Sequence, residues 1–215
     1  MLDLATPIRK CNYTAHESKN MNTCLAILLA LRCATGFCPQ QDDIWQHVIV
    51  NPRLVQLRSI TPSPNQLSII RKALAARARV DRWSCAEGDE PDWVEKVTFD
   101  DLPISPTEPA ILVEAGMGCA RGGQGANGAM WVVQFKGNKL TFLATPEQKF
   151  SGWLYSIQPT TSHGFRDLVL GWHMRAGESN LFYFRFDGKS YRLFGSAQLL
   201  SDEHGAEKIV PTPAS

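Results

Sequence analysis

The clearest helical pattern in the chain lies in the segment TPSPNQLSIIRKALAARARV. Ser63 followed by Gln66 fits a capping box, and Pro64 suits the first helical position. The spacing predicts a helix over residues 64–79 that packs on a core and turns its basic residues to solvent. Its apolar face consists of residues that recur three or four positions apart: Leu67, Ile70, Leu74 and Ala78. We expect four aromatic residues of the strand region to pack against this helix: Trp131, Phe182, Phe184 and Phe186.

From Ala110 onward, the pattern changes to strands and repeats itself. The first copy runs through ILVEAGM and AMWVVQFKGNKLTFL, and the second through LVLGWHM and NLFYFRFDGKSYRLF. The turns KGNK and FDGK are tight-hairpin signals, because Gly and Asn tolerate positive φ. The pattern predicts an α+β fold, in which an N-terminal helical segment packs on an antiparallel sheet made of two similar three-stranded units. The segment FSGWLYSIQP adds a strand between the units.

The N-terminal pattern predicts a secretion leader. The apolar stretch Cys24–Leu31 is eight residues long. A bilayer span needs roughly 20 residues, whereas this length suits the apolar region of a signal peptide. Ala34 and Gly36 offer a cleavage site, and Met21 is a possible true start. The alternative is a buried helix that opens an intracellular domain.

These signals divide the chain into four parts. We expect a leader at 1–36, a helical segment at 37–102, the β repeat region at 110–200 and a flexible tail at 201–215. The proline-rich join PISPTEP cannot hold regular structure. A leader predicts a periplasmic or secreted protein, with no transmembrane span in the mature chain.

The six cysteines are consistent with export. Cleavage after Gly36 leaves three of them, of which Cys85 and Cys119 are the natural disulfide pair. The alternative is two buried thiols. The sequence has no Cys-x-x-Cys motif and no Cys/His cluster, so no metal site is expected.

Charge and motif spacing argue against nucleic-acid and nucleotide partners. The net charge is +1, which gives no excess of positive charge of the kind that indicates a nucleic-acid partner. The loop GMGCARGGQGANGAMW contains G-x-G-x-x-G, but a β-branched and aromatic run follows it where a dinucleotide turn would open a helix. The GKS at Gly188 lacks the upstream glycine of a P-loop. No cofactor is expected.

The stretch SHGFRDLVLGWHM…NLFYFRFDGKSYRL resembles the strand–loop–strand units of FG-GAP or VCBS-type β repeats, over about half of the chain. The resemblance implies β units of secreted or cell-surface proteins. The calcium loop of that family is absent here, so no metal site carries over. The layout of leader, helical region, GCARGGQG loop and FDG strand pair also looks like that of uncharacterised exported bacterial proteins, which implies an envelope location. The matching residues are Gly164, Asp167, Leu168 and Val169, then Phe186, Asp187 and Gly188.

Two kinds of site are compatible with these residues. The leading hypothesis is a non-enzymatic envelope module that binds a protein or glycan through a sheet face or the 118–128 loop. The alternative is a periplasmic hydrolase that uses Cys119 with His173 and Asp167, or the carboxylate pair Glu114 and Asp167. The binding hypothesis rests on loop polar residues and on tryptophans beside glycines: Arg121, Gln124, Asn127, Trp153 and Trp172.

Overall fold

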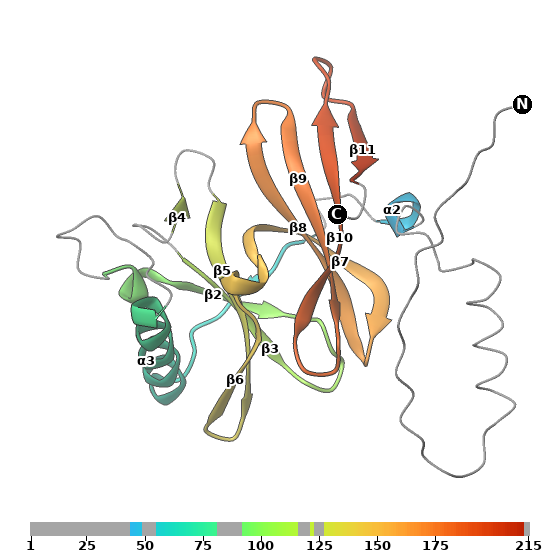
Figure 1. Ribbon diagram of the computed structural model, residues 1–215. Coiled ribbons are helices and arrows are strands. Elements are labelled where there is room, and N and C mark those ends of the chain that lie inside the picture. The colour runs from blue at the N-terminus through green and yellow to red at the C-terminus, as the bar shows by residue number, and fades with distance from the viewer. Residues whose placement is uncertain (1–43, 49–54, 81–91, 116–120, 123–126, 213–215) are drawn as a thin grey trace, which may run out of the picture. The chain divides into compact units, whose positions relative to one another are not determined.

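The computed structural model describes residues 44–48, 55–80, 92–115, 121–122 and 127–212, all within the compact unit Gln41–Ser215 (Figure 1). The helical elements are α2 (Ile44–His47), α3 (Pro64–Val80), η3 (Asp92–Lys96) and η4 (Pro146–Gln148). The strands are β1 (Arg58–Ser59), β2 (Thr98–Leu102), β3 (Ala110–Glu114), β4 (Arg121–Gly122), β5 (Asn127–Lys136), β6 (Lys139–Ala144), β7 (Ser151–Ser162), β8 (Phe165–Arg175), β9 (Glu178–Phe186), β10 (Tyr191–Ser201) and β11 (Glu207–Pro211). The predicted leader and all six cysteines, including the pair Cys85 and Cys119, lie outside the described residues.

The strands form one antiparallel sheet, so the molecule is β-rich. Its path runs β1-β2-β3-β5-β7-β8-β9-β10-β11, with β4 and β6 each paired to β5. We call β1, β2, β3, β5 and β6 the β5 sheet, and β7 to β11 the β8 sheet. The two meet where Gly128 pairs with Gly152. Gly152 has φ 108°, and a Cβ there would overlap the carbonyl oxygen of Gly171, so this junction requires glycine.

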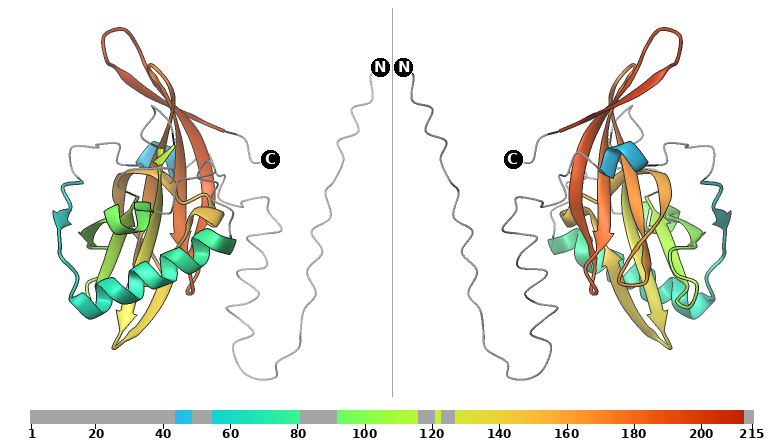
Figure 2. Two further views of the ribbon diagram at one scale, coloured as in Figure 1. Left: turned by 90° about the vertical axis from the view of Figure 1, so that its left-hand side faces the viewer. Right: turned by 90° about the vertical axis from the view of Figure 1, so that its right-hand side faces the viewer.

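Three apolar clusters hold the sheet and the helices together. The inter-sheet core lies between the β5 sheet and the β8 sheet and includes Leu112, Met130, Leu168 and Phe184. A second cluster packs α3 on the other face of the β5 sheet, and a third packs α2 on the other face of the β8 sheet. Figure 2 shows α3 in front in its left view and α2 in front in its right view. We call the faces toward the inter-sheet core inner and the other faces outer.

The predicted helix is present as α3, one residue longer than expected. Its capping box forms, because the Ser63 amide donates to Gln66 Oε1 and the Gln66 amide donates to Ser63 Oγ. Ile70 and Leu74 are fully buried. Trp131 packs beneath α3, as expected.

One packing expectation was wrong. Phe184 and Phe186 were expected against the same helix as Trp131, yet they lie in the inter-sheet core. The pairing of the two strand sets is the same: Ile111 pairs with Val133, and Leu168 pairs with Phe184. In this match, β3 corresponds to β8 and β5 to β9. Because only β7 lies between the two sets, β8 runs antiparallel to β3, and the inner and outer faces of the second set are exchanged. Equivalent residues therefore face opposite sides of one continuous sheet, and its division into two similar units stays a prediction.

Two predicted boundaries differ from the structure. The segment 37–102, expected to be helical, also contains β1 and β2. Within the expected flexible tail, Glu207–Pro211 forms β11 and pairs with β10 from Ala197 to Ser201. Ile209 packs against the cluster beneath α2, which explains why this part of the tail is ordered. Within the described residues, no helix is both long and apolar enough to cross a membrane.

Candidate functional site

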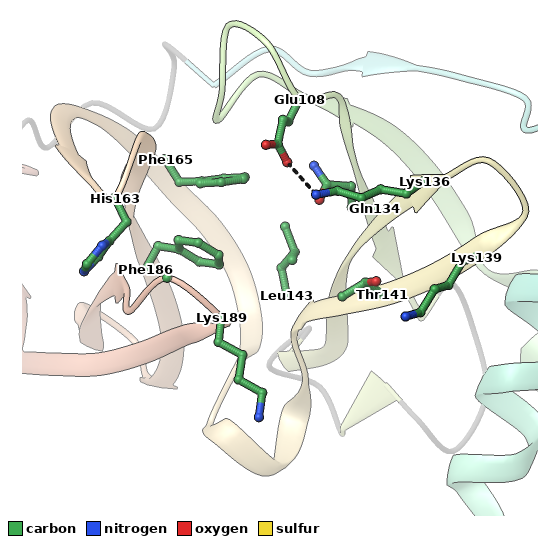
Figure 3. Close-up of a pocket in the computed structure, with 11 residues that line it drawn as sticks. Glu108, Gln134, Lys136, Lys139, Thr141, Leu143, His163, Phe165, Phe186 and Lys189 are labelled. Carbon is green, nitrogen blue, oxygen red and sulfur yellow. Dashed lines mark ion pairs between the residues drawn. The ribbon is translucent and has the colours of Figure 1, made fainter.

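A pocket of about 600 Å³ opens at one end of the inter-sheet core (Figure 3). Strands β5 and β6 form one side, and the β7–β8 and β9–β10 turns form the other. It lies where these hairpins extend past the apolar core, so its walls combine core residues with polar turn residues. The lining consists of Glu108, Gln134, Lys136, Lys139, Thr141, Leu143, His163, Phe165, Phe186, Gly188 and Lys189.

Two phenylalanines form the apolar wall. The ring centroids of Phe165 and Phe186 lie 4.3 Å apart at an interplanar angle of 38°. Both rings are more than 90% buried and belong to the inter-sheet core, which fixes their positions. Leu143 lies opposite them in Figure 3. The wall therefore offers a preformed surface for an apolar or aromatic group.

The charge of the pocket is positive. Its lysines are Lys136, Lys139 and Lys189, and its one carboxylate is Glu108, so the lining carries a net charge of +2 with His163 neutral. Lys136 Nζ lies 3.8 Å from Glu108 Oε2. Neither Lys139 nor Lys189 has a carboxylate within ion-pair distance among the described residues. Two ammonium groups thus remain available to an anion.

Gln134 adds an amide to the lining. The residue is only 5% exposed, yet it lines the pocket. No hydrogen bond joins its side chain to another described residue. Its amide atoms are not among the buried polar atoms that lack a partner, so the small exposed part of the residue includes the amide that faces the pocket. This side chain is therefore a free donor and acceptor for a ligand in the pocket.

The turn that carries Lys189 is held by Asp187. Asp187 Oδ1 accepts hydrogen bonds from the Ser190 amide at 2.7 Å and the Lys189 amide at 2.8 Å, and Oδ2 accepts from Arg192 Nε at 2.9 Å. These bonds, that of the Ser190 amide most strongly, lower the pKa of Asp187 to about 2. The carboxylate therefore stays ionised at neutral pH and fixes the main chain beneath the lysine.

His163 lies at the turn between β7 and β8, as its position before Gly164 suggests. It has φ 51° and Gly164 has φ 82°, the paired left-handed conformation of a tight hairpin. A Cβ built on Gly188 would lie 3.6 Å from His163 Nδ1, so the imidazole lies beside the turn that carries Lys189. The β7–β8 and β9–β10 turns thus contact one another at the rim of the pocket.

Asp167 is placed away from this pocket, on the outer face of the β8 sheet. It is 1% exposed. Its oxygens accept hydrogen bonds from Thr160 Oγ1 at 2.8 Å, Ser162 Oγ at 2.7 Å and Tyr183 OH at 3.0 Å. Arg185 Nε lies 3.7 Å from Asp167 Oδ2. A carboxylate engaged in this way supports the fold and has little capacity left for a substrate.

The structure does not bring Asp167 and His173 together. They lie on one strand, six residues apart, which is about 20 Å along an extended chain. Cys119, the third member of the proposed set, lies outside the described residues. Glu114 falls at the same parity as Leu112 on the inner face of the β5 sheet, whereas Asp167 is on an outer face. The proposed carboxylate pair is therefore on two separate faces.

Asn127 and His173 do meet, in a structural role. Asn127 Nδ2 donates to the His173 carbonyl oxygen at 2.9 Å, and the His173 amide donates to Asn127 Oδ1 at 2.8 Å. The β7–β8 pairing reaches Gly171 at this end of β8. The amide of Asn127 therefore replaces a neighbouring strand for His173.

Of the other predicted binding residues, the two tryptophans do not line the pocket. Trp153 packs against Gly171, where a Cβ would overlap its indole. Trp172 is half-buried and pairs with Asn180. The side chain of Arg121 and the whole of Gln124 lie outside the described residues. Trp153 and Trp172, the described members of this set, share no contact that would make them one site with the pocket.

The pocket residues were missed by sequence reasoning, although one signal was present. Both predicted hairpin turns, KGNK and FDGK, carry lysines. In each turn taken alone, a lysine is expected to be an ordinary solvent-exposed residue. That the two turns lie on opposite sides of one pocket follows from the packing of the two sheets. No family model, curated protein or solved structure matches the chain.

Proposed function

We propose that this protein is a non-enzymatic binding module whose pocket takes an organic anion with an apolar body. The observation that carries the proposal is the arrangement of two lysines around the wall formed by Phe165 and Phe186. Lys139 and Lys189 have no ion-pair partner in the part of the chain that the structure describes. The anion belongs to a protein or glycan partner of the cell envelope, the exported setting that the N-terminal pattern predicts.

The size and chemistry of the pocket suit such a ligand. Ligand sites typically have volumes of about 300 to 1,000 Å³ and combine apolar walls with a few polar groups. Burying apolar ligand surface on the phenylalanine wall contributes roughly 25 cal/mol per Å². The lysines add charge attraction, and Gln134 can orient a polar group of the ligand. The phenylalanine wall and the lysines thus supply binding energy, and Gln134 supplies the orientation of the ligand.

The alternative, a hydrolase that uses Cys119, His173 and Asp167, has weaker support. Its two described members are about 20 Å apart along β8. Three hydroxyl groups already occupy the oxygens of Asp167.

The proposal is tested with 8-anilinonaphthalene-1-sulfonate, an aromatic anion whose fluorescence rises on leaving water. We expect saturable binding of one equivalent. The double variant Lys139→Glu/Lys189→Glu should bind at least about tenfold more weakly, because it reverses two charges that face the ligand. Competition by aromatic carboxylates would extend the result to other organic anions.

The matched control is Lys72→Glu/Lys208→Glu, which changes the net charge equally at exposed sites on α3 and β11. Its affinity should stay within about twofold of the parent protein, since distant surface charges are screened by salt. Equal losses in the two double variants would contradict a site at the pocket.

A further inference from the structure

Strand β6 leaves one edge of the sheet open beside the pocket. It pairs with β5 along Lys139–Ala144, and no described strand pairs with its other edge. Figure 1 shows the β5–β6 hairpin projecting below the rest of the sheet. In an antiparallel strand, alternate residues direct their N–H and C=O groups to opposite edges. The outer edge of β6 therefore presents backbone donors and acceptors with no described partner.

The open edge and the pocket are continuous. Alternate residues of β6, namely Lys139, Thr141 and Leu143, line the pocket. At the Ala144 end of β6, η4 and β10 lie against the strand. There Gln148 Nε2 donates a hydrogen bond to Ser190 Oγ at 3.4 Å. The open part covers about four residues, or about 13 Å of strand. A chain laid along this edge would turn every second side chain toward Lys189 and the phenylalanine wall.

We propose that the ligand is an extended acidic peptide that adds a strand to the open edge of β6. This inference rests on the proposed function of the pocket. A peptide main chain matches the spacing of the unpaired backbone groups, and alternate side chains then enter the pocket. Acidic side chains meet Lys139 and Lys189, and an apolar side chain between them meets Phe165 and Phe186. A glycan could supply the charge but would leave the backbone edge unpaired.

The test uses the peptide acetyl-Thr-Glu-Thr-Phe-Thr-Glu-amide, in which every second side chain is acidic or aromatic. Isothermal titration should show binding that weakens at least about tenfold in Lys139→Glu/Lys189→Glu and not in Lys72→Glu/Lys208→Glu. Two further peptides carry N-methyl groups on alternate residues, one set on odd and one on even positions. Only one set should lose binding, because only alternate amides face β6. Amide hydrogen exchange should slow at alternate residues of Lys139–Leu143.

Each outcome separates the two proposals. If both N-methylated peptides bind like the parent peptide, strand addition is overturned while the pocket remains an anion site. If oligogalacturonate binds and the peptide does not, the partner is an acidic glycan and the inference is again overturned. If the peptide, oligogalacturonate and the fluorescent sulfonate all fail to bind, the proposed function falls as well.

Discussion

The two sides of the β8 sheet border polar groups of opposite kinds near the β7–β8 turn. On the outer face, Asp167 is buried and accepts hydrogen bonds from three hydroxyl groups. On the inner face, Phe165 borders a pocket in which Lys139, Lys189 and Gln134 lack described side-chain partners. Asp167 has the residue type that suggests catalysis. The pocket nevertheless has the groups that remain available for a ligand.

A candidate binding site is marked less by the type of a polar residue than by whether its polar atoms are free to bond to a ligand. A buried carboxylate with three hydrogen bonds stabilises the fold, because its removal takes those bonds away. The Gln134 amide and the ammonium groups of Lys139 and Lys189 have no such partners among the described residues, so they contribute no comparable stability. They are available to a ligand instead. Stability and binding should therefore respond oppositely to substitutions at the two places.

The largest effect is expected from Asp167→Ala. Removing the carboxylate leaves Ser162 Oγ and Arg185 without this partner, and we expect a loss of about 3 kcal/mol in the free energy of unfolding. Thr160 Oγ1 and Tyr183 OH lie 3.0 Å apart and can still bond to one another. Urea denaturation followed by circular dichroism measures the loss. Binding of the fluorescent sulfonate by the folded fraction should not change.

The matched control for this variant is Asp101→Ala. Asp101 pairs with Arg58 at 2.7 Å, but both side chains are more than a third exposed. An exposed pair contributes at most about 1 kcal/mol. If the two alanine variants lose similar stability, the carboxylate of Asp167 is not the structural centre described above.

A smaller loss is expected from Asn127→Ala, at the far end of β5 from the pocket. The variant removes two hydrogen bonds to the main chain of His173, which should cost about 1 to 2 kcal/mol. Asn127→Asp keeps the acceptor and should fall between the variant and the parent protein. Thermal unfolding measures both. An unchanged midpoint in Asn127→Ala would show that water replaces the side chain without cost.

The smallest effect on stability, and the sharpest test of the comparison, is expected from Gln134→Leu. The free energy of unfolding should change by less than about 0.5 kcal/mol, since the Gln134 amide makes no hydrogen bond to another described residue and its atoms are accessible from the pocket. Ligand affinity should fall. The control is Gln158→Leu, because Gln158 is equally buried but donates to Ser156 Oγ at 2.6 Å. That variant should be destabilised, and a comparable loss in Gln134→Leu would mean that Gln134 is also structural.

Local elements were readable from the sequence because their signals are local. The capping box at Ser63 and the apolar face with Ile70 and Leu74 predicted α3, and KGNK and FDGK predicted the two hairpins. The repeat pattern matched the two strand sets in order, and the structure pairs Ile111 with Val133 and Leu168 with Phe184 in the same way. The face that each strand presents was not readable, because it depends on how many strands lie between the matched sets.

The sequence by itself determined the helix, the hairpins and the strand segments, since hydrophobic periodicity, capping and turn residues act over a few positions. Only the tertiary structure decided which polar groups find partners. Thr160, Ser162 and Tyr183 converge on Asp167 through the β7–β8 and β8–β9 pairings, whereas Lys139 and Lys189 come to one pocket from turns fifty residues apart. Whether a polar group is satisfied depends on neighbours distant in sequence, so a pattern along the chain cannot report it.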